Sequence, residues 1–205
     1  WNKFGYNFKG KNEDQIQLDQ AADETKSAFM ERILGKEHNM VRHAIVAYAV
    51  CGYLELYYYP NLPGGTAIAT KELVDHKFNS PSNDYFDAYE LVMCIKYPID
   101  LDSTHTENPL KGTFAYEHKY MSRILNGIAR YSSEAKLNPY ETIEFPENFD
   151  VIGGKCMILD CFSEPYIDAK TNYKKFGLML LMEIHRTEME FAMQQKGREL
   201  LQLFK

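Results

Sequence analysis

Apolar residues recur at helical spacing in several parts of the chain, two of which lie in its first two thirds. The stronger pattern has members at i, i+3, i+4, i+7 and i+8: Met121, Ile124, Leu125, Ile128 and Ala129. This spacing predicts an amphipathic helix with one buried face. A weaker stripe, formed by Ala22, Thr25, Phe29 and Ile33, predicts a helix over 19–35 that stops at Gly35.

Between and after these helices the chain carries short runs rich in aromatic and β-branched residues. They lie at 53–59, 66–70, 89–98, 141–145, 155–162 and 175–184, and each is typical of a β-strand. Because strands interleave with helices throughout, we expect one α/β (α+β) domain with a mixed central β-sheet flanked by helices. Residues 1–44 are expected to form an N-terminal segment with one helix inside that same domain.

The C-terminal region predicts a third helix. Its apolar stripe consists of Met189, Ala192, Met193, Leu200, Leu203 and Phe204. Thr187 precedes the stripe and Glu190 follows three residues later, which is the pattern of a capping box. We therefore expect Thr187 to be the N-cap of this helix, with His185 lying before it.

The stretch "YYYPNLPGGTAIATKEL", residues 57–73, contains a glycine loop that could be a phosphate cradle or a turn. A phosphate-binding loop leads into a helix N-terminus, where backbone amides point at the anion. Here Gly64 and Gly65 lead into the β-type run at 66–70, and Pro60 and Pro63 are turn residues. The sequence therefore predicts the turn of a β-hairpin over 60–65.

Composition and charge narrow the function. The net charge of −6 and the pI of about 5.6 disfavour binding to nucleic acid or to an anionic membrane and suit a basic protein partner. The longest mostly apolar stretch, 44–54, has 11 residues, too few to span a bilayer. The chain begins at Trp1 rather than Met, which suggests trimming.

The 4 cysteines lie in apolar runs and read as buried free thiols. Together with the absence of an Asn-x-Ser/Thr sequon, they favour a cytoplasmic protein. The Cys156–Cys161 pair supplies only half of a zinc site, and His38 and His43 are five residues apart, so they cannot bind one metal from one helix face. We expect no metal and no cofactor.

One segment suggests an enzyme. Gly5, Gly10 and Lys11 match the glycine and lysine positions of a nucleotide-binding loop, and Asp160 could hold the magnesium ion. However, Asn12 stands where a Ser or Thr hydroxyl is required, and no apolar strand precedes Gly5. A nucleotide-binding hydrolase is therefore the alternative hypothesis, and we expect no catalytic residues.

Read in order, several stretches resemble the Suppressor of fused domain family. They are "LELYYYPNLPGGTAIATKEL", "YELVMCIKYP", "YMSRILNGIARYSSEAKLNPYETIEF", "GGKCMILDCF" and "LMLLMEIHRTEMEFAMQQKGRELLQLF", which together cover roughly 45–205. The last stretch is the most specific, because the family runs a hydrophobic strand into a Glu-rich helix with a mid-helix glycine, here Gly197.

The resemblance implies a mixed sheet flanked by helices and a non-enzymatic role in protein binding. Animal members restrain a transcription factor in Hedgehog signalling and carry a second, C-terminal domain. Stand-alone domains of this kind look bacterial and are proposed to be immunity proteins that neutralise a cognate toxin. The resemblance therefore predicts a Suppressor of fused-like domain over 45–205, with a protein partner such as a toxin.

The resemblance also predicts two site residues. In animal members a tyrosine in an Ala-Arg-Tyr stretch and an acidic residue that opens the next strand hold the partner peptide. The matching positions are Tyr131 and Glu141, although the acid is Glu rather than Asp and the intervening loop is shorter. The alternative reading is that Tyr131 covers a helix face and Glu141 is a solvated strand end.

Overall fold

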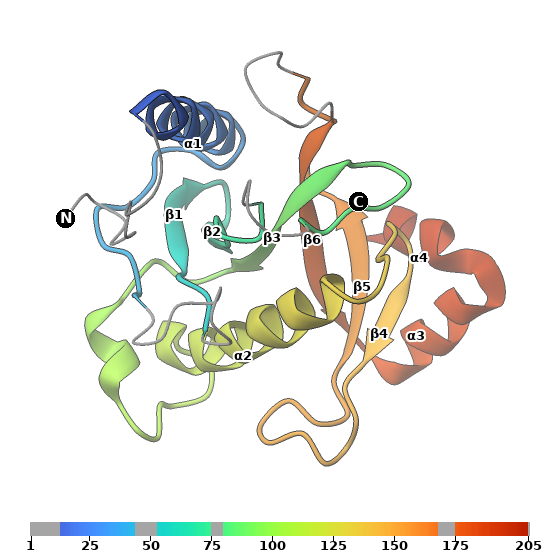
Figure 1. Cartoon of the computed structure of the whole chain (residues 1–205). Coiled ribbons are helices and arrows are strands. Elements are labelled where there is room, and N and C mark those ends of the chain that lie inside the picture. The colour runs from blue at the N-terminus through green and yellow to red at the C-terminus, as the bar shows by residue number, and fades with distance from the viewer. Residues whose placement is uncertain (1–12, 44–52, 75–79, 168–174, 205) are drawn as a thin grey trace.

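Six strands form one mixed β-sheet in the order β1-β2-β3-β6-β5-β4 (Figure 1). The computed structural model describes residues 13–43, 53–74, 80–167 and 175–204. The strands are β1 (Tyr57–Leu62), β2 (Gly65–Ala69), β3 (Ala88–Ile95), β4 (Thr142–Glu144), β5 (Cys156–Cys161) and β6 (Phe176–Ile184). β3 and β6 pair in parallel and the other neighbours pair antiparallel, which confirms the predicted mixed sheet in a single domain.

Helices cover both faces of the sheet. They are α1 (Glu13–Leu34), α2 (Phe114–Ser132), α3 (Arg186–Phe191) and α4 (Gly197–Leu203), with short helical turns at Asp102–His105 and Ala192–Lys196. Because side chains alternate along a strand, α2 packs on Ile68, Leu91 and Met179, whereas α1 packs on the opposite face against Tyr59 and Phe176. α3 and α4 cover the β5 end of that second face.

α2 forms where the strong apolar periodicity predicted a helix. The Thr113 hydroxyl caps its N-terminus by accepting a hydrogen bond from the Tyr116 amide (3.4 Å). Ile124, Leu125 and Ile128 are fully buried against the sheet, and each such side chain stabilises the fold by about 1.5–3 kcal/mol. The α1 prediction is also confirmed, because Ala22 and Phe29 are buried, although the helix starts at Glu13.

The glycine loop is the turn of a β1–β2 hairpin, as predicted. Gly64 and Gly65 both have positive φ, and a Cβ added at Gly65 would lie 1.9 Å from the Ile95 carbonyl oxygen, so no other residue fits there. The predicted strand at 53–59 and turn at 60–65 were placed too early in the chain. Pro60 lies within β1 because this edge strand bulges between Tyr59 and Leu62 and does not require its amide.

The C-terminal helix differs from its prediction. α3 begins at Arg186, with His185 at the N-cap, and the Glu188 carboxylate accepts a hydrogen bond from the His185 amide (2.6 Å). The expected N-cap at Thr187 is therefore wrong by two residues. The helix is also interrupted, because Gln195 adopts φ 63°, and Gly197 then begins α4, where an added Cβ would lie 2.2 Å from the Tyr140 carbonyl oxygen.

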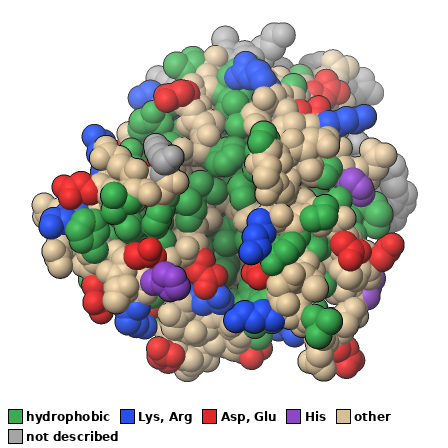
Figure 2. Space-filling model, turned by 180° about the vertical axis from the view of Figure 1, so that it is seen from behind, with side chains coloured by type: hydrophobic (Ala, Val, Ile, Leu, Met, Phe, Trp, Pro, Cys, Tyr) green, Lys and Arg blue, Asp and Glu red, His purple; other side chains and the backbone are tan. Residues whose placement is uncertain are grey.

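Viewed from behind, the molecule has a hollow where hydrophobic side chains gather, with charged side chains around it (Figure 2).

Cys156 is buried and Cys161 is half-buried, but Cys94 is exposed, so the expected burial of the cysteines fails there. Cys94 points to the sheet face shared by α1 and α3, at a position that the described helices leave uncovered. Within the described ranges, no helix is long and apolar enough to cross a membrane.

Candidate functional site

The three consecutive tyrosines of β1 connect two different polar regions. Tyr57 and Tyr59 point to the α1 face of the sheet, and Tyr58 points to the α2 face. The hydroxyls of Tyr57 and Tyr59 donate to Glu55 (3.0 Å) and Glu37 (3.4 Å). There are therefore two candidate functional sites, one on each face of the sheet.

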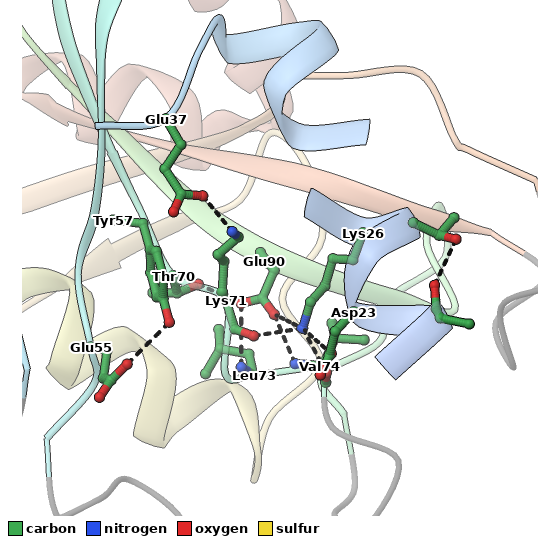
Figure 3. A network of polar contacts seen from close by, with 12 residues as sticks. Asp23, Lys26, Glu37, Glu55, Tyr57, Thr70, Lys71, Leu73, Val74 and Glu90 are labelled. Atoms are coloured by element: carbon green, nitrogen blue, oxygen red, sulfur yellow. Dashed lines mark hydrogen bonds and ion pairs between the residues drawn. The ribbon is translucent and has the colours of Figure 1, made fainter. Parts of the chain in front are cut away.

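On the α1 face, a carboxylate is completely buried. Glu90 lies in the central strand β3 with no exposed surface, and its side chain enters a set of polar contacts shown in Figure 3. Glu90 Oε2 accepts from the Thr70 hydroxyl (2.6 Å) and the Leu73 amide (3.3 Å), and Oε1 accepts from the Val74 amide (3.0 Å). These bonds fix the chain just after β2 against β3.

Lys26 of α1 supplies the charge opposite Glu90. Its ammonium lies 3.6 Å from Glu90 Oε1 and donates to the carbonyl oxygens of Lys71 (2.6 Å) and Val74 (3.1 Å). Asp23, one turn earlier on α1, lies 3.7 Å from the same ammonium. Lys26 therefore ties α1 to the segment at 70–74, with both ends of the ion pair buried.

Lys71 and Glu72 extend this region toward β1. The Lys71 ammonium pairs with Glu37 and lies 4.7 Å from the centre of the Tyr57 ring. The Glu72 carboxylate accepts from the Glu55 amide (2.9 Å). Burial raises the pKa of Glu72 to about 7, and the carboxylates of Glu55 and Glu90 add to that rise.

We call this region the Glu90 cluster; it comprises Lys26, Glu37, Thr70, Lys71, Glu72 and Glu90. Buried charges with shifted pKa values are common at active sites, but here each oxygen of Glu90 already has two partners. The cluster therefore has little capacity left for a ligand and serves the fold. Sequence reasoning assigned it no role, although Glu90, a lone charge in the run "YELVMCI", was the available signal.

On the opposite side of β1, α2 forms one wall of an open groove. The groove has a volume of about 1390 Å³ and is lined by α2, by parts of 42–43 and 53–56, by the turn at 104–107 and by the loop at 149–152. These segments are far apart in the sequence and are brought together by the packing of α2 on the sheet. We call this region the α2 groove.

The inner wall of the α2 groove contains a buried histidine. His118 Nε2 lies 2.8 Å from the Tyr58 hydroxyl, and the His118 ring stacks on Phe114. Burial, together with the nearby Arg42 guanidinium, lowers the pKa of His118 to about 4. His118 is therefore neutral near pH 7 and forms part of the structural wall.

Exposed aromatic side chains gather along the same groove. Tyr53, Tyr131 and Phe149 line it and keep 64%, 50% and 47% of their surface exposed. The Arg130 guanidinium lies 5.7 Å from the centre of the Tyr53 ring. Aromatic and arginine side chains are the residues most enriched at binding hot spots, so this composition fits a protein-binding surface.

The two predicted site residues, Tyr131 and Glu141, lie in different surroundings. Tyr131 is near the end of α2, half-exposed, and lines the α2 groove. Glu141 is exposed, just before β4, and lies outside the set of described residues that line the groove. Its carboxylate accepts from the Asn138 amide (2.8 Å) and side chain (3.1 Å). Their joint role in binding stays a prediction.

Most residues of the alternative enzyme hypothesis lie where the structure does not test them. Gly5, Gly10 and Lys11 lie outside the described residues. Asp160 lies in β5, where its carboxylate accepts from the Cys161 amide (2.9 Å). Among the residues that the structure describes, no cluster of three or more His, Cys, Asp or Glu side chains could hold a metal ion, and His43 pairs instead with Glu55 (2.7 Å).

Comparison with known proteins identifies the fold. No protein-family model matches the chain, and no curated protein matches it. Among solved structures, the chain is similar to a chain described as "the Sufu-Fu complex crystal structure", with a TM-score of 0.58 and 14% sequence identity. The match covers 88% of this chain and 82% of the other. This chain has a Suppressor of fused-like fold.

Proposed function

We propose that this chain is a non-enzymatic protein-binding domain that acts in the cytoplasm. The observation that carries the proposal is the group of exposed aromatic side chains along the α2 groove, Tyr53, Tyr131 and Phe149. The fold supports it, because the similar solved structure is described as a complex of Sufu with Fu. A binding partner would bury aromatic surface that otherwise faces water.

Tyr131 and Glu141 are the proposed contact residues for the partner. Glu141 directly precedes β4, which is an edge strand and pairs only with β5. The Glu141 carbonyl oxygen accepts a hydrogen bond from the Leu159 amide (3.0 Å), and the Phe145 amide donates to the Lys155 carbonyl oxygen (3.0 Å). By alternation, Thr142 and Glu144 direct their backbone groups away from β5. A partner segment can add there as a further strand, and the half-exposed Tyr131 ring is proposed as a second, apolar contact of the same partner.

The finer part of the proposal is the partner's identity. We propose an immunity role, in which the chain binds and neutralises a cognate toxin. The net charge of −6 supports a basic partner, because complementary charge speeds association. A toxin gene beside the gene for this chain would favour the immunity role.

The direct test is affinity capture of the tagged, full chain from its native host, followed by titration of the captured protein. We expect Tyr131→Ala to weaken binding by at least tenfold, as loss of a hot spot does. Phe204→Ala is the matched control, because Phe204 is 48% exposed and lies in the C-terminal segment, away from α2. If both variants bind like the wild type, Tyr131 is not a contact residue.

A thermal-shift scan with magnesium and nucleotides tests the absence of catalysis. The binding-domain proposal predicts no nucleotide-dependent change in melting temperature. A ligand at 100 times its dissociation constant stabilises a protein by about 2.7 kcal/mol. A shift of that size, lost in Lys11→Ala, would replace the proposal with the nucleotide hydrolase.

A further inference from the structure

The α2 groove carries the opposite charge balance from the rest of the chain. The whole chain has 23 basic and 29 acidic residues. The described residues that line the groove include 4 basic side chains, Arg42, Lys119, Arg123 and Arg130. They include 3 acidic ones, Glu107, Glu134 and Asp150. The described lining residues thus carry a net charge of +1 (4 basic minus 3 acidic), against −6 for the whole chain.

Two of these basic side chains, Lys119 and Arg42, bond to uncharged oxygens. The Lys119 ammonium donates to the Glu107 carbonyl oxygen (3.2 Å), and Arg42 Nη1 donates to the Ser122 hydroxyl (3.1 Å). Both acceptors are uncharged oxygens, so these bonds orient the cations without neutralising them. Arg123 is paired with Asp150 (2.6 Å), whose side chain is 85% exposed.

The basic residues of α2 form a row along the groove. Lys119, Arg123 and Arg130 are separated by four and seven residues, so they project within about 40° of one another and span about 17 Å along the helix axis. An extended chain advances about 3.3 Å per residue. A segment of about five or six extended residues would therefore run the length of the row.

The size of the groove also favours a peptide over a small molecule. Its volume of about 1390 Å³ exceeds the range of typical small-molecule sites, which is about 300–1,000 Å³. The exposed rings of Tyr53, Tyr131 and Phe149 offer apolar contacts in the same groove. The surface thus combines a row of cations with aromatic anchors.

We infer that the α2 groove binds an extended, acidic segment of a partner protein, with Lys119, Arg123 and Arg130 pairing with its carboxylates. This inference rests on the proposed protein-binding function and names the chemistry of the segment that the groove takes. It concerns the wall formed by α2, whereas strand addition would use the edge of β4. The basic groove and the acidic remainder of the surface would thus contact different parts of a partner.

The test uses two fluorescein-labelled peptides and fluorescence anisotropy with the full chain. The probe is a peptide of about ten residues in which glutamate alternates with phenylalanine, long enough to cover the row with margin. The control peptide has glutamine in place of every glutamate. We expect the acidic peptide to bind at least about tenfold more tightly at low salt, and the difference to shrink as salt screens the charges.

Three variants locate the interaction. Lys119→Glu should weaken binding of the acidic peptide by about fivefold or more, because it replaces attraction with repulsion in the groove. Lys36→Glu makes the same charge change at an exposed position after α1 and should leave the affinity unchanged. Asp150→Asn releases Arg123 and should tighten binding by about twofold to threefold.

The Asp150→Asn gain is decisive, because damage to the fold cannot strengthen binding. Equal affinity for the two peptides, or equal weakening by Lys119→Glu and Lys36→Glu, would overturn the inference. Binding of the captured partner to the Lys119→Glu variant distinguishes failure of this inference from failure of the proposed protein-binding function. If the partner binds Lys119→Glu as tightly as the wild type, the protein-binding function stands and the groove inference is wrong; if the chain captures no partner, the function itself fails.

Discussion

The Glu90 cluster and the α2 groove lie on opposite faces of the same hairpin, and both are rich in charged and aromatic side chains. In the cluster, Glu90 and Lys26 are buried and direct all of their polar atoms at other parts of the chain. In the groove, Tyr53, Tyr131 and Phe149 remain exposed. Similar residue types therefore serve the fold on one face and remain accessible on the other.

The difference shows why a perturbed buried charge is a weak guide to function in this protein. The cluster contains a carboxyl group with a pKa of about 7, that of Glu72, and one of its oxygens already accepts a hydrogen bond from the Glu55 amide. The groove contains ordinary surface side chains whose arrangement is unusual. The two regions differ in how much of their side-chain surface remains exposed. Only exposed side chains can contact a partner.

The sharpest way to test the comparison is to remove the carboxylate at the centre of the cluster. We expect Glu90→Ala to lower the free energy of unfolding by about 3–5 kcal/mol, because Lys26 would stay buried without its counter-charge. The Thr70 hydroxyl and the Val74 amide would also lose their acceptor. Urea denaturation monitored by circular dichroism measures the loss.

A double replacement is the control for this prediction. Lys26→Met combined with Glu90→Leu removes both charges at once, and it should cost less than Glu90→Ala alone, since no unpaired charge remains. The acidic peptide should still bind the α2 groove of the double variant. A loss below about 1 kcal/mol for Glu90→Ala would mean that the cluster is not a structural centre.

The second prediction concerns acid stability and the wall of the groove. His118 has a folded-state pKa of about 4, below its usual 6.5, so the folded protein binds fewer protons than the unfolded chain between these values. The contribution of neutral His118 to the free energy of unfolding is therefore fully present above pH 6.5 and is lost as the pH falls toward 4. The expected loss is about 2–3 kcal/mol.

An NMR titration of the His118 ring checks the pKa directly, and denaturation across the same pH range checks the stability. His118→Gln should flatten the acid limb of the stability profile. His105→Gln, at an exposed position on the groove, is the matched control and should leave that limb unchanged. A His118 that titrates near pH 6.5 would show that the groove wall is open to water.

The cluster should show the opposite pH dependence. Glu72 has its pKa raised to about 7, so the folded protein binds more protons than the unfolded chain between pH 4.5 and 7. Its favourable contribution is present below pH 4.5 and is lost as the pH rises through 7. Because Glu72 is only partly buried and solvent screens it, we expect an effect of about 1 kcal/mol.

Glu72→Gln isolates this effect, since the amide oxygen can still accept from the Glu55 amide. The variant should be more stable than the wild type at about pH 8 and equal to it at about pH 4, because only the wild type carries the added charge at high pH. Paired urea titrations at the two pH values give the difference. The same stability gain at both values would point to packing rather than charge.

The sequence predicted the sheet and α2 well because both depend on local periodicity. Ile124, Leu125 and Ile128 repeat at helical spacing and are buried as expected. The hairpin followed from turn chemistry at Gly64 and Gly65. The helix break at Gln195 was missed, because it depends on a residue with positive φ and on the contact between Gly197 and Tyr140, which is remote in sequence.

The candidate site was only partly predictable for the same reason. Tyr131 came from the family resemblance, and the structure places it in the groove. Tyr53 and Phe149 reach the same groove from segments that are distant in sequence, and no local pattern links them. Glu90 was a lone charge in an apolar strand, but its partner Lys26 is 64 residues away and could not be read from spacing.

The smallest expected change in stability belongs to Tyr131, and it bears most directly on the comparison. The side chain is half-exposed at the end of α2, so Tyr131→Ala should alter the free energy of unfolding by no more than about 0.5 kcal/mol. The same variant should weaken partner binding by about 2 kcal/mol, as a hot-spot residue does. Tyr131→Phe keeps the ring and should retain most of the affinity if apolar contact dominates. Melting temperature and affinity measured on the same samples decide the matter: a destabilised Tyr131→Ala with unchanged affinity would move Tyr131 from the binding surface to the fold, alongside the Glu90 cluster.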